Sequence, residues 1–267
     1  MQTLLMMRNS LGSLIRKSNR HPKSLVGKHD WVNFLTRLIP VKTEHNLIRI
    51  GPNSDGGYLL PDDLKDIGMC ISPGTGNATG FELDLLRWEI PSLLIDKDES
   101  AQPEKLPEKS IFLNKFVSGY DSQEFISLNT LVETCDTQLD LILQMDIEGH
   151  EYNALNAISR NNLDRFRIIV IEFHYSFDWI FKHNWDWQYG QIFSKLLENH
   201  SVVHTHPNNA GGQFSYAGIN YPNLMEITFL RKDRIRDFGE YVSETHPLEC
   251  DNNSNLPTMK KTMLGIE

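Results

Sequence analysis

The sequence predicts an α/β protein whose core is a doubly wound, mostly parallel sheet of seven strands with one antiparallel edge. From residue 46 onward, short apolar runs alternate with longer amphipathic segments, which is the pattern of repeated strand–helix units. A glycine-rich turn at Gly74 and Gly76 follows the first of these runs, and an aspartate, Asp96, ends the second. The last two runs have no clear helix between them, so we expect them to pair antiparallel at one edge.

Seven apolar runs are the expected strands of this sheet. They cover residues 68–72, 92–95, 111–117, 139–145, 167–172, 201–205 and 224–230. Amphipathic segments at residues 79–88, 128–135, 152–158 and 187–198 are the expected helices between them. Apolar residues at helical spacing over residues 4–15, and a second segment over residues 31–38, predict a helical extension upstream. The expected division is a basic N-terminal extension (1–45), a main domain (46–239) and a polar, loosely held C-terminal tail (240–267).

Composition and charge narrow the class of protein. The chain has 267 residues, of which 40% are hydrophobic, so it can bury a full core, and its three separated cysteines are typical of reduced thiols. No apolar run reaches the roughly 20 residues that span a bilayer, and no signal peptide is recognisable. These features favour a cytoplasmic protein.

The charge is distributed unevenly along the chain. The net charge is −9, but residues 1–45 carry eight Lys or Arg and two acidic residues, a balance of 8 − 2 = +6, which leaves −9 − 6 = −15 for the remainder. The acidic body argues against a nucleic-acid partner. The basic arm could bind an anionic membrane surface, an acidic protein or a second copy of the chain, or it could be a solvated helix.

The glycine-rich turn indicates a nucleotide ligand. Glycines such as Gly74 and Gly76 let the backbone approach a ligand closely, and the N-terminus of the following helix offers N–H groups. Asp96 lies 20 residues after Gly76, where a carboxylate at the end of the next strand can accept hydrogen bonds from two ribose hydroxyls. Asp98 is the alternative ribose ligand, because it shares the parity of Asp96 along an extended segment.

Two observations bear on which nucleotide this turn would bind. A dinucleotide fingerprint needs Gly or Ala at position 79, where this chain has Thr79. The shorter pattern, which ends at Ala78, suits a nucleoside without a pyrophosphate, such as S-adenosylmethionine. The alternative is a tight surface turn without a ligand.

Three consecutive strands are expected to end in ionisable residues. The fourth ends in Asp146, the fifth in Glu172 and His174, and the sixth runs through His206. Because ligands of open α/β sheets bind beyond the carboxyl ends of the strands, these side chains should meet at one rim. Asp146 or His174 could be the base that deprotonates a substrate hydroxyl, with Glu172 and His206 as orienting groups. Alternatively, Asp146, Glu172 and His206 could hold Mg²⁺ or Mn²⁺, or single carboxylates could cap the following helices.

Aromatic residues are dense between residues 173 and 189. Phe173, Tyr175, Phe177 and Trp179 alternate along the chain, which is typical of a strand extension or of a lid whose rings stack on a planar or sugar substrate. Ordinary packing in the core is the alternative.

Several segments, taken in order, resemble the FkbM-type methyltransferases. The resemblance covers roughly residues 48–234 and is strongest in LILQMDIEGHEYNAL (141–155), similar to the family's D-[IV]-E-G-x-E core after the fourth strand. Similar segments are GPNSDGGYLLP (51–61), SPGTGNATGFELDLL (72–86), IVIEFHY (169–175), HTHPNN (204–209) and LMEITFLRKD (224–233).

This resemblance implies a Rossmann-like class I methyltransferase fold, with S-adenosylmethionine as the methyl donor and a hydroxyl as the usual acceptor. The residues that would border the donor are Asp55, Gly56, Gly57, Tyr58, Gly74, Gly76, Asp96 and Asp146. The residues that would face the transfer site are Asp146, Glu148 and His150. The chain departs from the family pattern at Ser72-Pro73, where an acid often precedes the first glycine, and at His150, where Ala is more usual.

The function that we expect is O-methylation of a sugar, a glycan or a sugar-containing metabolite. A nicotinamide-dependent oxidoreductase on a similar fold and a catalytically silent scaffold are the alternatives. The oligomeric state stays open at this point.

Overall fold

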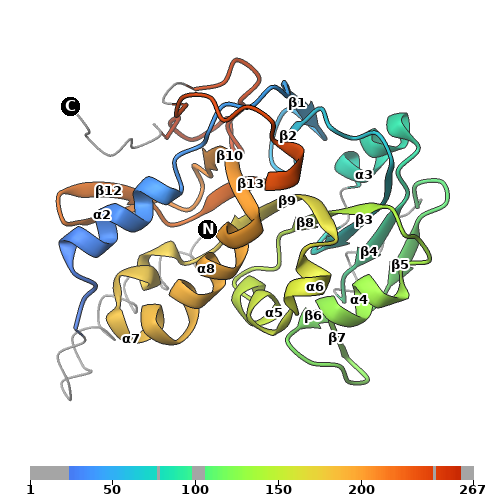
Figure 1. Cartoon of the computed structure of the whole chain (residues 1–267), viewed down its shortest axis with the longest axis horizontal. Helices are drawn as coiled ribbons and strands as arrows, with labels where there is room; N and C mark the ends of the chain where they lie inside the picture. The colour runs from blue at the N-terminus through green and yellow to red at the C-terminus, as the bar shows by residue number, and fades with distance from the viewer. Residues whose placement is uncertain (1–23, 77–78, 98–105, 243–244, 260–267) are drawn as a thin grey trace.

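The computed structural model describes residues 24–76, 79–97, 106–242 and 245–259. Its centre is a seven-stranded sheet with further elements packed on both faces (Figure 1). In sheet order the strands are β10 (His200–Pro207), β13 (Met225–Arg231), β9 (Phe166–Phe173), β8 (Asp140–Met145), β3 (Ile67–Pro73), β4 (Ser92–Ile95) and β5 (Ile111–Leu113).

The strand order shows a doubly wound sheet. β3 pairs in parallel with both β4 and β8, and β9 continues the parallel set beyond β8. β13 runs antiparallel to both β9 and β10. The predicted mostly parallel sheet with an antiparallel edge is therefore confirmed. The chain leaves β3 toward β4 and later returns to the other side of β3 as β8, so the crevice between the ends of β3 and β8 is where such sheets bind ligands.

Helices surround the sheet. The described helices are α2 (Lys28–Arg37), α3 (Gly80–Leu85), α4 (Leu128–Thr134), α5 (Glu151–Ala157), α6 (Arg160–Leu163), α7 (Lys182–Asn184) and α8 (Gly190–Asn199). Short helical turns are η1 (Leu86–Trp88), η3 (Ser176–Ile180), η4 (Trp185–Tyr189) and η5 (Lys232–Arg234). Ser127 caps α4 by accepting a hydrogen bond from the backbone N–H of Thr130.

The two faces of the sheet bury two separate apolar clusters. Along β8, Leu141 and Leu143 join the cluster under α2, α4, α5 and α8, whereas Ile142 joins the cluster under α3. Strand side chains alternate between faces, so a strand that is covered on both sides reads as one continuous apolar run. Every residue of β9 is buried for this reason.

Helix α2 belongs to this core. Trp31 and Phe34 are buried in the same cluster as the sheet, and the ring of Phe34 packs against Trp185 and Phe193 with centroids 4.5 and 4.9 Å away. The helix that we expect over 31–38 is present and begins earlier, at Lys28. The helix that we expect over 4–15 lies outside the described residues.

Three small sheets were not expected from the sequence. β1 (Leu47–Ile50) and β2 (Tyr58–Pro61) form an antiparallel hairpin, as do β11 (Gln213–Tyr216) and β12 (Ile219–Pro222). β6 (Phe116–Ser118) pairs in parallel with β7 (Phe125–Ser127). The single strand expected over 111–117 is therefore wrong: the chain turns at Lys115, whose N–H bonds to the carbonyl of Leu113, and only β5 joins the main sheet.

The aromatic segment after β9 packs into the core and does not extend the strand. Tyr175 has a φ of +54°, which ends the extended conformation, and η3 follows directly. Phe173 and Trp179 are fully buried, with ring centroids 5.9 Å apart. The alternation that suggested a strand extension is therefore misleading, and packing explains Phe173 and Trp179.

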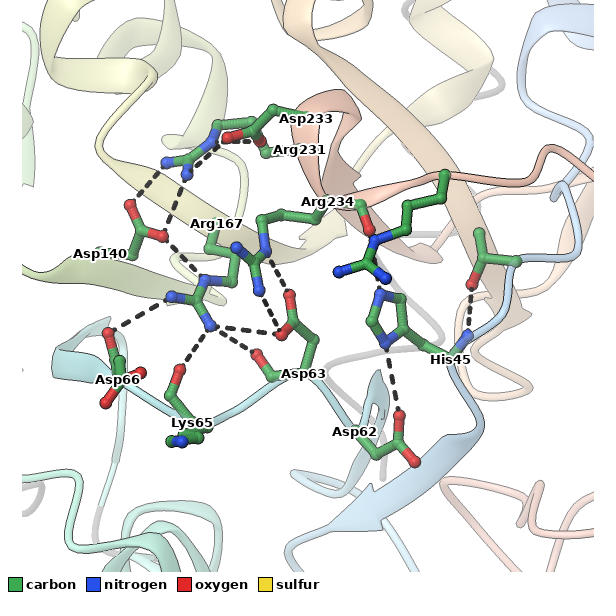
Figure 2. Close-up of polar contacts among 12 residues, drawn as sticks. His45, Asp62, Asp63, Lys65, Asp66, Asp140, Arg167, Arg231, Asp233 and Arg234 are labelled. Carbon is green, nitrogen blue, oxygen red and sulfur yellow. Dashed lines mark hydrogen bonds and ion pairs between the residues drawn. The ribbon is translucent and has the colours of Figure 1, made fainter.

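An ionic network with buried Arg167 and Asp63 at its centre joins the strand ends at the edge of the sheet opposite the crevice (Figure 2). Arg167 at the start of β9 donates to Asp140 at the start of β8, at 2.8 Å, and Arg231 at the end of β13 donates to the same carboxylate. Arg234 forms a two-bonded pair with Asp63, at 2.7 and 2.8 Å. The network is structural, because each charge in it meets an opposite charge or a backbone carbonyl.

The described part of the tail is held by hydrogen bonds. We call residues 245–259 the C-terminal segment. Asn253 donates its N–H to Asn209, whose side-chain amide donates in turn to the carbonyls of Asn253, Leu256 and Pro257. The expectation of a loosely held tail is wrong for this segment, because polar residues bind the end of β10 where no apolar pattern signals contact. Among the described residues, no helix is long and apolar enough to cross a membrane.

Candidate active site

The glycine turn lies directly against Asp146. Gly74 follows β3 with a φ of +80°, and a Cβ added there would stand 1.6 Å from the carbonyl oxygen of Asp146. The N–H of Asp146 donates to the carbonyl of Pro73 at 3.1 Å, and the N–H of Gly74 donates to Ile95 at 2.9 Å. Only glycine fits this position, because both the dihedral angle and the contact exclude a side chain. The turn and Asp146 thus meet at the crevice between β3 and β8.

Asp96 closes the other side of the turn. Its Oδ2 accepts a hydrogen bond from the N–H of Gly76 at 3.1 Å. A Cβ added at Gly76 would meet nothing within 4 Å, so this side of the turn is open. The four residues expected at one edge of the sheet, Gly74, Gly76, Asp96 and Asp146, lie together as predicted. Asp98, the alternative ribose ligand, lies outside the described residues.

The hairpin β1–β2 brings the D-G-G-Y segment to the same edge. The N–H of Gly51 bonds to Asp84 on α3, which fixes the hairpin loop beside the helix that follows the glycine turn. Gly57 has no room for a side chain, since a Cβ would stand 1.9 Å from the carbonyl oxygen of Pro52. Tyr58 is buried, and burial followed by the charges of nearby carboxylates raises its pKa well above the usual value. Asp55 itself is exposed.

An acid approaches the turn from α3 as well. Glu82 is 2% exposed, and its Oε1 lies 2.5 Å from the hydroxyl of Ser72. Burial raises the pKa of Glu82. The acid that often precedes the first glycine in the methyltransferases that the sequence resembles is absent from the strand, and Glu82 supplies a carboxyl group beside that position from the helix.

A row of ionisable side chains, one imidazole and two carboxyl groups, crosses three strands next to the turn. In the strand register, His206 of β10 is opposite Glu226 of β13, which is opposite Glu172 of β9. Burial is the main cause that raises the pKa of Glu172, and the neighbouring charge of Asp146 raises it further. Burial also raises the pKa of Asp146 and of Glu226. Of this adjacent pair, Glu172 holds its proton more strongly, because the charge of Asp146 disfavours a second charge beside it.

His174 stands between three carboxylates. Its Nδ1 is 2.8 Å from Oε1 of Glu151, and its Nε2 is 3.4 Å from Oε2 of Glu148 and 3.8 Å from Oδ1 of Asp146. Burial alone would lower the pKa of His174, but its bonds to Glu148 and Glu151 outweigh burial and raise the pKa to about 11. Both ring nitrogens of His174 therefore already face carboxylates.

Glu151, and not Asp146 or Glu148, satisfies the turn that leads into α5. Its Oε1 accepts hydrogen bonds from the N–H groups of Ile147 and Gly149, at 3.3 and 3.1 Å. Capping therefore does not account for Asp146 and Glu148. His150 is exposed at the start of α5.

His206 is engaged elsewhere. Its Nδ1 lies 3.2 Å from Glu249 and its Nε2 lies 3.1 Å from Oδ1 of Asn252, both in the C-terminal segment. The side-chain amide of Asn252 also donates to Glu226 at 2.6 Å and to Asp55 at 3.0 Å. The C-terminal segment thus ties the end of β10 to the D-G-G-Y loop.

The metal set expected from the sequence is not brought together. Asp146, Glu172 and His206 do not form one group. Among the described residues, two groups of acids and histidines have ligand atoms within 4.8 Å of one another, and they are Asp146 with Glu148 and His174, and Asp55 with Glu172 and Glu226.

Sequence reasoning assigned no role to four residues of this site. Glu226 is signalled by a single charge inside the apolar run at 224–230, and Glu151 by the last position of the D-x-E-G-x-E pattern. Glu249 and Asn252 carry no such signal, because only the tertiary structure brings the C-terminal segment to the sheet.

Two features together define the class of protein. The first is a mostly parallel sheet in which the antiparallel strand β13 lies between β9 and β10. The second is a glycine turn at the crevice, with an acid at the end of the next strand. This is the architecture of the α/β methyltransferases. The Methyltransferase FkbM domain family matches residues 27–203, and the chain belongs to this family of S-adenosylmethionine-dependent methyltransferases. No curated protein matches the chain in sequence.

The residues at the crevice fit this donor. Thr75 Oγ1 within the turn and Asp146 Oδ1 beside it are buried and have no hydrogen-bond partner. Buried polar atoms are seldom left unpaired unless a ligand or water pairs with them. A donor without a pyrophosphate also suits a turn that is followed by Thr79 instead of a third small residue.

Proposed function

We propose that this protein transfers the methyl group of S-adenosylmethionine to a hydroxyl oxygen of a sugar, a glycan or a sugar-containing metabolite. The observation that carries the proposal is Oδ1 of Asp146, a buried acceptor atom without a hydrogen-bond partner, beside the glycine turn. A hydroxyl group placed there would satisfy this atom by donating its hydrogen. The hydroxyl oxygen would then lie next to the donor loop.

The residues of the turn would hold the donor. The backbone at Gly74 and Gly76 allows close approach, and Asp96 supplies acceptor oxygens for ribose hydroxyls. When bound, S-adenosylmethionine supplies an electrophilic methyl carbon on a sulfonium sulfur.

Asp146 would orient the acceptor and take its proton. As the bond between the methyl carbon and sulfur breaks, the new bond to the acceptor oxygen forms, and the sulfur keeps the electron pair. The hydroxyl proton passes to Oδ1 of Asp146. Alignment of the reacting atoms alone can supply about 7–11 kcal/mol of the barrier. Of the two bases expected from the sequence, geometry favours Asp146, because both nitrogens of His174 already face carboxylates.

Glu172 and His206 would act as orienting groups. Oε1 of Glu172 accepts a hydrogen bond from the side-chain amide of Asn208 at 2.7 Å, which fixes the carboxyl group next to Asp146. His206 fixes Asn252, and through it the D-G-G-Y loop at Asp55.

Tyr175 supports a sugar acceptor. Its ring rests on Gly149, where an added Cβ would come within 2.5 Å of the ring, and the side chain is 51% exposed. It follows His174 directly, so an aromatic face lies at the rim of the site. Aromatic faces suit the apolar side of a sugar ring, and the nearby carboxyl groups suit its hydroxyls.

The proposal is tested by offering labelled S-adenosylmethionine with a panel of monosaccharides, methyl glycosides and nucleotide sugars, and by locating the transferred methyl group by NMR. We expect an O-methyl product with at least one sugar. Asp146→Asn should lower kcat by about 10²–10⁴-fold, the usual contribution of a positioned base. Asp136→Asn, the same change at an exposed residue on another part of the molecule, is the matched control.

Two results would overturn the proposal. The first is methylation of nitrogen or carbon in place of oxygen. The second is an Asp146→Asn variant that turns over as fast as the Asp136→Asn control.

A further inference from the structure

We propose that Asp146, Glu148 and His174 bind a divalent metal ion, with Mn²⁺ as the best match, next to the glycine turn. One ligand atom from each residue lies within 4.8 Å of the other two. Nε2 of His174 is 3.4 Å from Oε2 of Glu148 and 3.8 Å from Oδ1 of Asp146. Ligand atoms about 2.1 Å from a six-coordinate ion lie about 3 Å apart, so small side-chain movements would complete the site.

The second nitrogen of His174 is held as it is in metal-binding histidines. Nδ1 is 2.8 Å from a carboxylate oxygen of Glu151, which is completely buried. Such a carboxylate accepts the Nδ1 hydrogen. Nε2, which faces Asp146 and Glu148, would bind the ion in exchange for its own proton. Glu151 is itself fixed by the N–H groups of Ile147 and Gly149.

An independent observation comes from Asp146. Its Oδ1 is buried and has no hydrogen-bond partner, and this same atom is the one that faces Nε2 of His174. A buried acceptor without a donor is costly. A metal ion at this position would supply the missing partner.

The negative charge around His174 also favours a metal ion. Three carboxylates, those of Asp146, Glu148 and Glu151, surround a single imidazole. A divalent ion would balance this excess of negative charge, and a set of oxygens with one imidazole suits Mn²⁺. The side chain of Glu148 is 85% exposed, so the ion would keep coordination positions open toward solvent and the acceptor.

The second group of acids, Asp55, Glu172 and Glu226, has no unpaired atom of this kind to favour a metal ion. Asp55 and Glu226 both accept hydrogen bonds from Asn252, and Glu172 accepts one from Asn208. The carboxyl groups of Asp55, Glu172 and Glu226 therefore already have hydrogen-bond donors within the protein.

The role of the ion rests on the proposed function, although its binding does not. With the ion in place, the acceptor oxygen would bind the metal beside Asp146, and the metal would lower the pKa of the hydroxyl. Oδ1 of Asp146 would then be a ligand of the ion, so the hydroxyl proton would pass to solvent in place of Asp146.

The test is Mn²⁺ binding to the full-length protein after EDTA treatment and dialysis, followed by calorimetry and by the EPR signal of free Mn²⁺. We expect one tight site per chain. Glu148→Gln changes an exposed side chain that should not disturb folding, and it should weaken binding at least tenfold. Glu151→Gln, which replaces the carboxylate partner of His174 and keeps an amide oxygen for the N–H groups of Ile147 and Gly149, should weaken binding about 10–100-fold. His183→Ala, which changes an exposed histidine on α7, is the matched control and should bind as the unmodified protein does.

The outcomes separate this inference from the proposed function. Absence of stoichiometric Mn²⁺ binding, or equal binding by Glu148→Gln and His183→Ala, would overturn the metal site. If methyl transfer to a hydroxyl survives EDTA without Mn²⁺ binding, the function stands and the metal site fails. If Mn²⁺ binds at these residues but no hydroxyl is methylated, the metal site stands and the function fails.

Discussion

Replacing Gly74 by alanine would test whether the turn after β3 is seated directly on Asp146. An added Cβ would stand 1.6 Å from the carbonyl oxygen of Asp146, whereas Cβ atoms essentially never approach closer than 3.0 Å. The turn and the end of β8 would therefore have to separate by at least 3.0 − 1.6 = 1.4 Å. The neighbouring atom belongs to the backbone, so no flexible side chain can move aside.

Two costs set the loss of stability in Gly74→Ala, the left-handed φ and the clash with the backbone. A side chain at a left-handed φ costs about 1–2 kcal/mol, and overpacking typically costs about 1–3 kcal/mol. The free energy of unfolding should therefore fall by roughly 2–5 kcal/mol. Because a displacement of about 1 Å in a reacting geometry can cost about 10²-fold in rate, methyl transfer should fall by about that factor.

Gly218→Ala is the matched control for this variant. Gly218 lies in the turn between β11 and β12 with a φ of +86°, and an added Cβ would meet nothing within 4 Å. It therefore carries the dihedral strain without the clash. Urea unfolding and calorimetric titration with S-adenosylmethionine would compare the two variants. The reasoning is refuted if Gly74→Ala binds the donor as tightly as Gly218→Ala and loses no more stability.

Two further predictions concern the C-terminal segment and a buried histidine. Asn252→Ala removes the side-chain hydrogen bonds to Asp55 and Glu226. Because each bond contributes about 1 kcal/mol, KM for S-adenosylmethionine should rise by about fivefold or more while kcat changes little. Steady-state kinetics that show a fall in kcat alone would contradict this. His200 is completely buried, and burial lowers its pKa below the usual value of 6.5. The unfolded chain therefore binds a proton that the folded protein resists, so this contribution to stability is present above pH 6.5 and is lost as the pH falls below it. His200→Gln should have a flatter dependence of the free energy of unfolding on pH, by at most about 1.4 kcal/mol per pH unit, and urea titrations at several pH values that show parallel curves would exclude this role.

The main sheet could be predicted because its signals are local. Apolar runs such as 139–145 and 167–172 are continuous, since β8 and β9 are covered on both faces, and the intervening segments have helical periodicity. The glycine turn and the acid that ends the next strand are also adjacent to strands in the sequence. Parallel strands end at one edge, so Gly74, Asp96 and Asp146 were placed correctly without coordinates.

Short irregular elements were not predicted because competing patterns resemble each other. The run over 111–117 looks like one strand, but Lys115 turns the chain and sends its second half into a separate pair with β7. The alternation from Phe173 to Trp179 resembles a strand, yet the left-handed conformation of Tyr175 ends it. A local turn of the backbone decides both cases, and hydropathy does not report it.

The doubly wound sheet, its antiparallel edge and the rim where the strands end are readable in the chain, because hydrophobic periodicity reflects which side chains avoid water. The neighbours of each ionisable side chain emerge only from the three-dimensional fold: His174 faces Asp146, Glu148 and Glu151, whereas His206 faces the C-terminal segment. Hydrogen-bond partners depend on contacts between residues far apart in the chain, such as Asp55 and Asn252. No local pattern encodes those contacts, because polar side chains pair through position in space and not through periodicity.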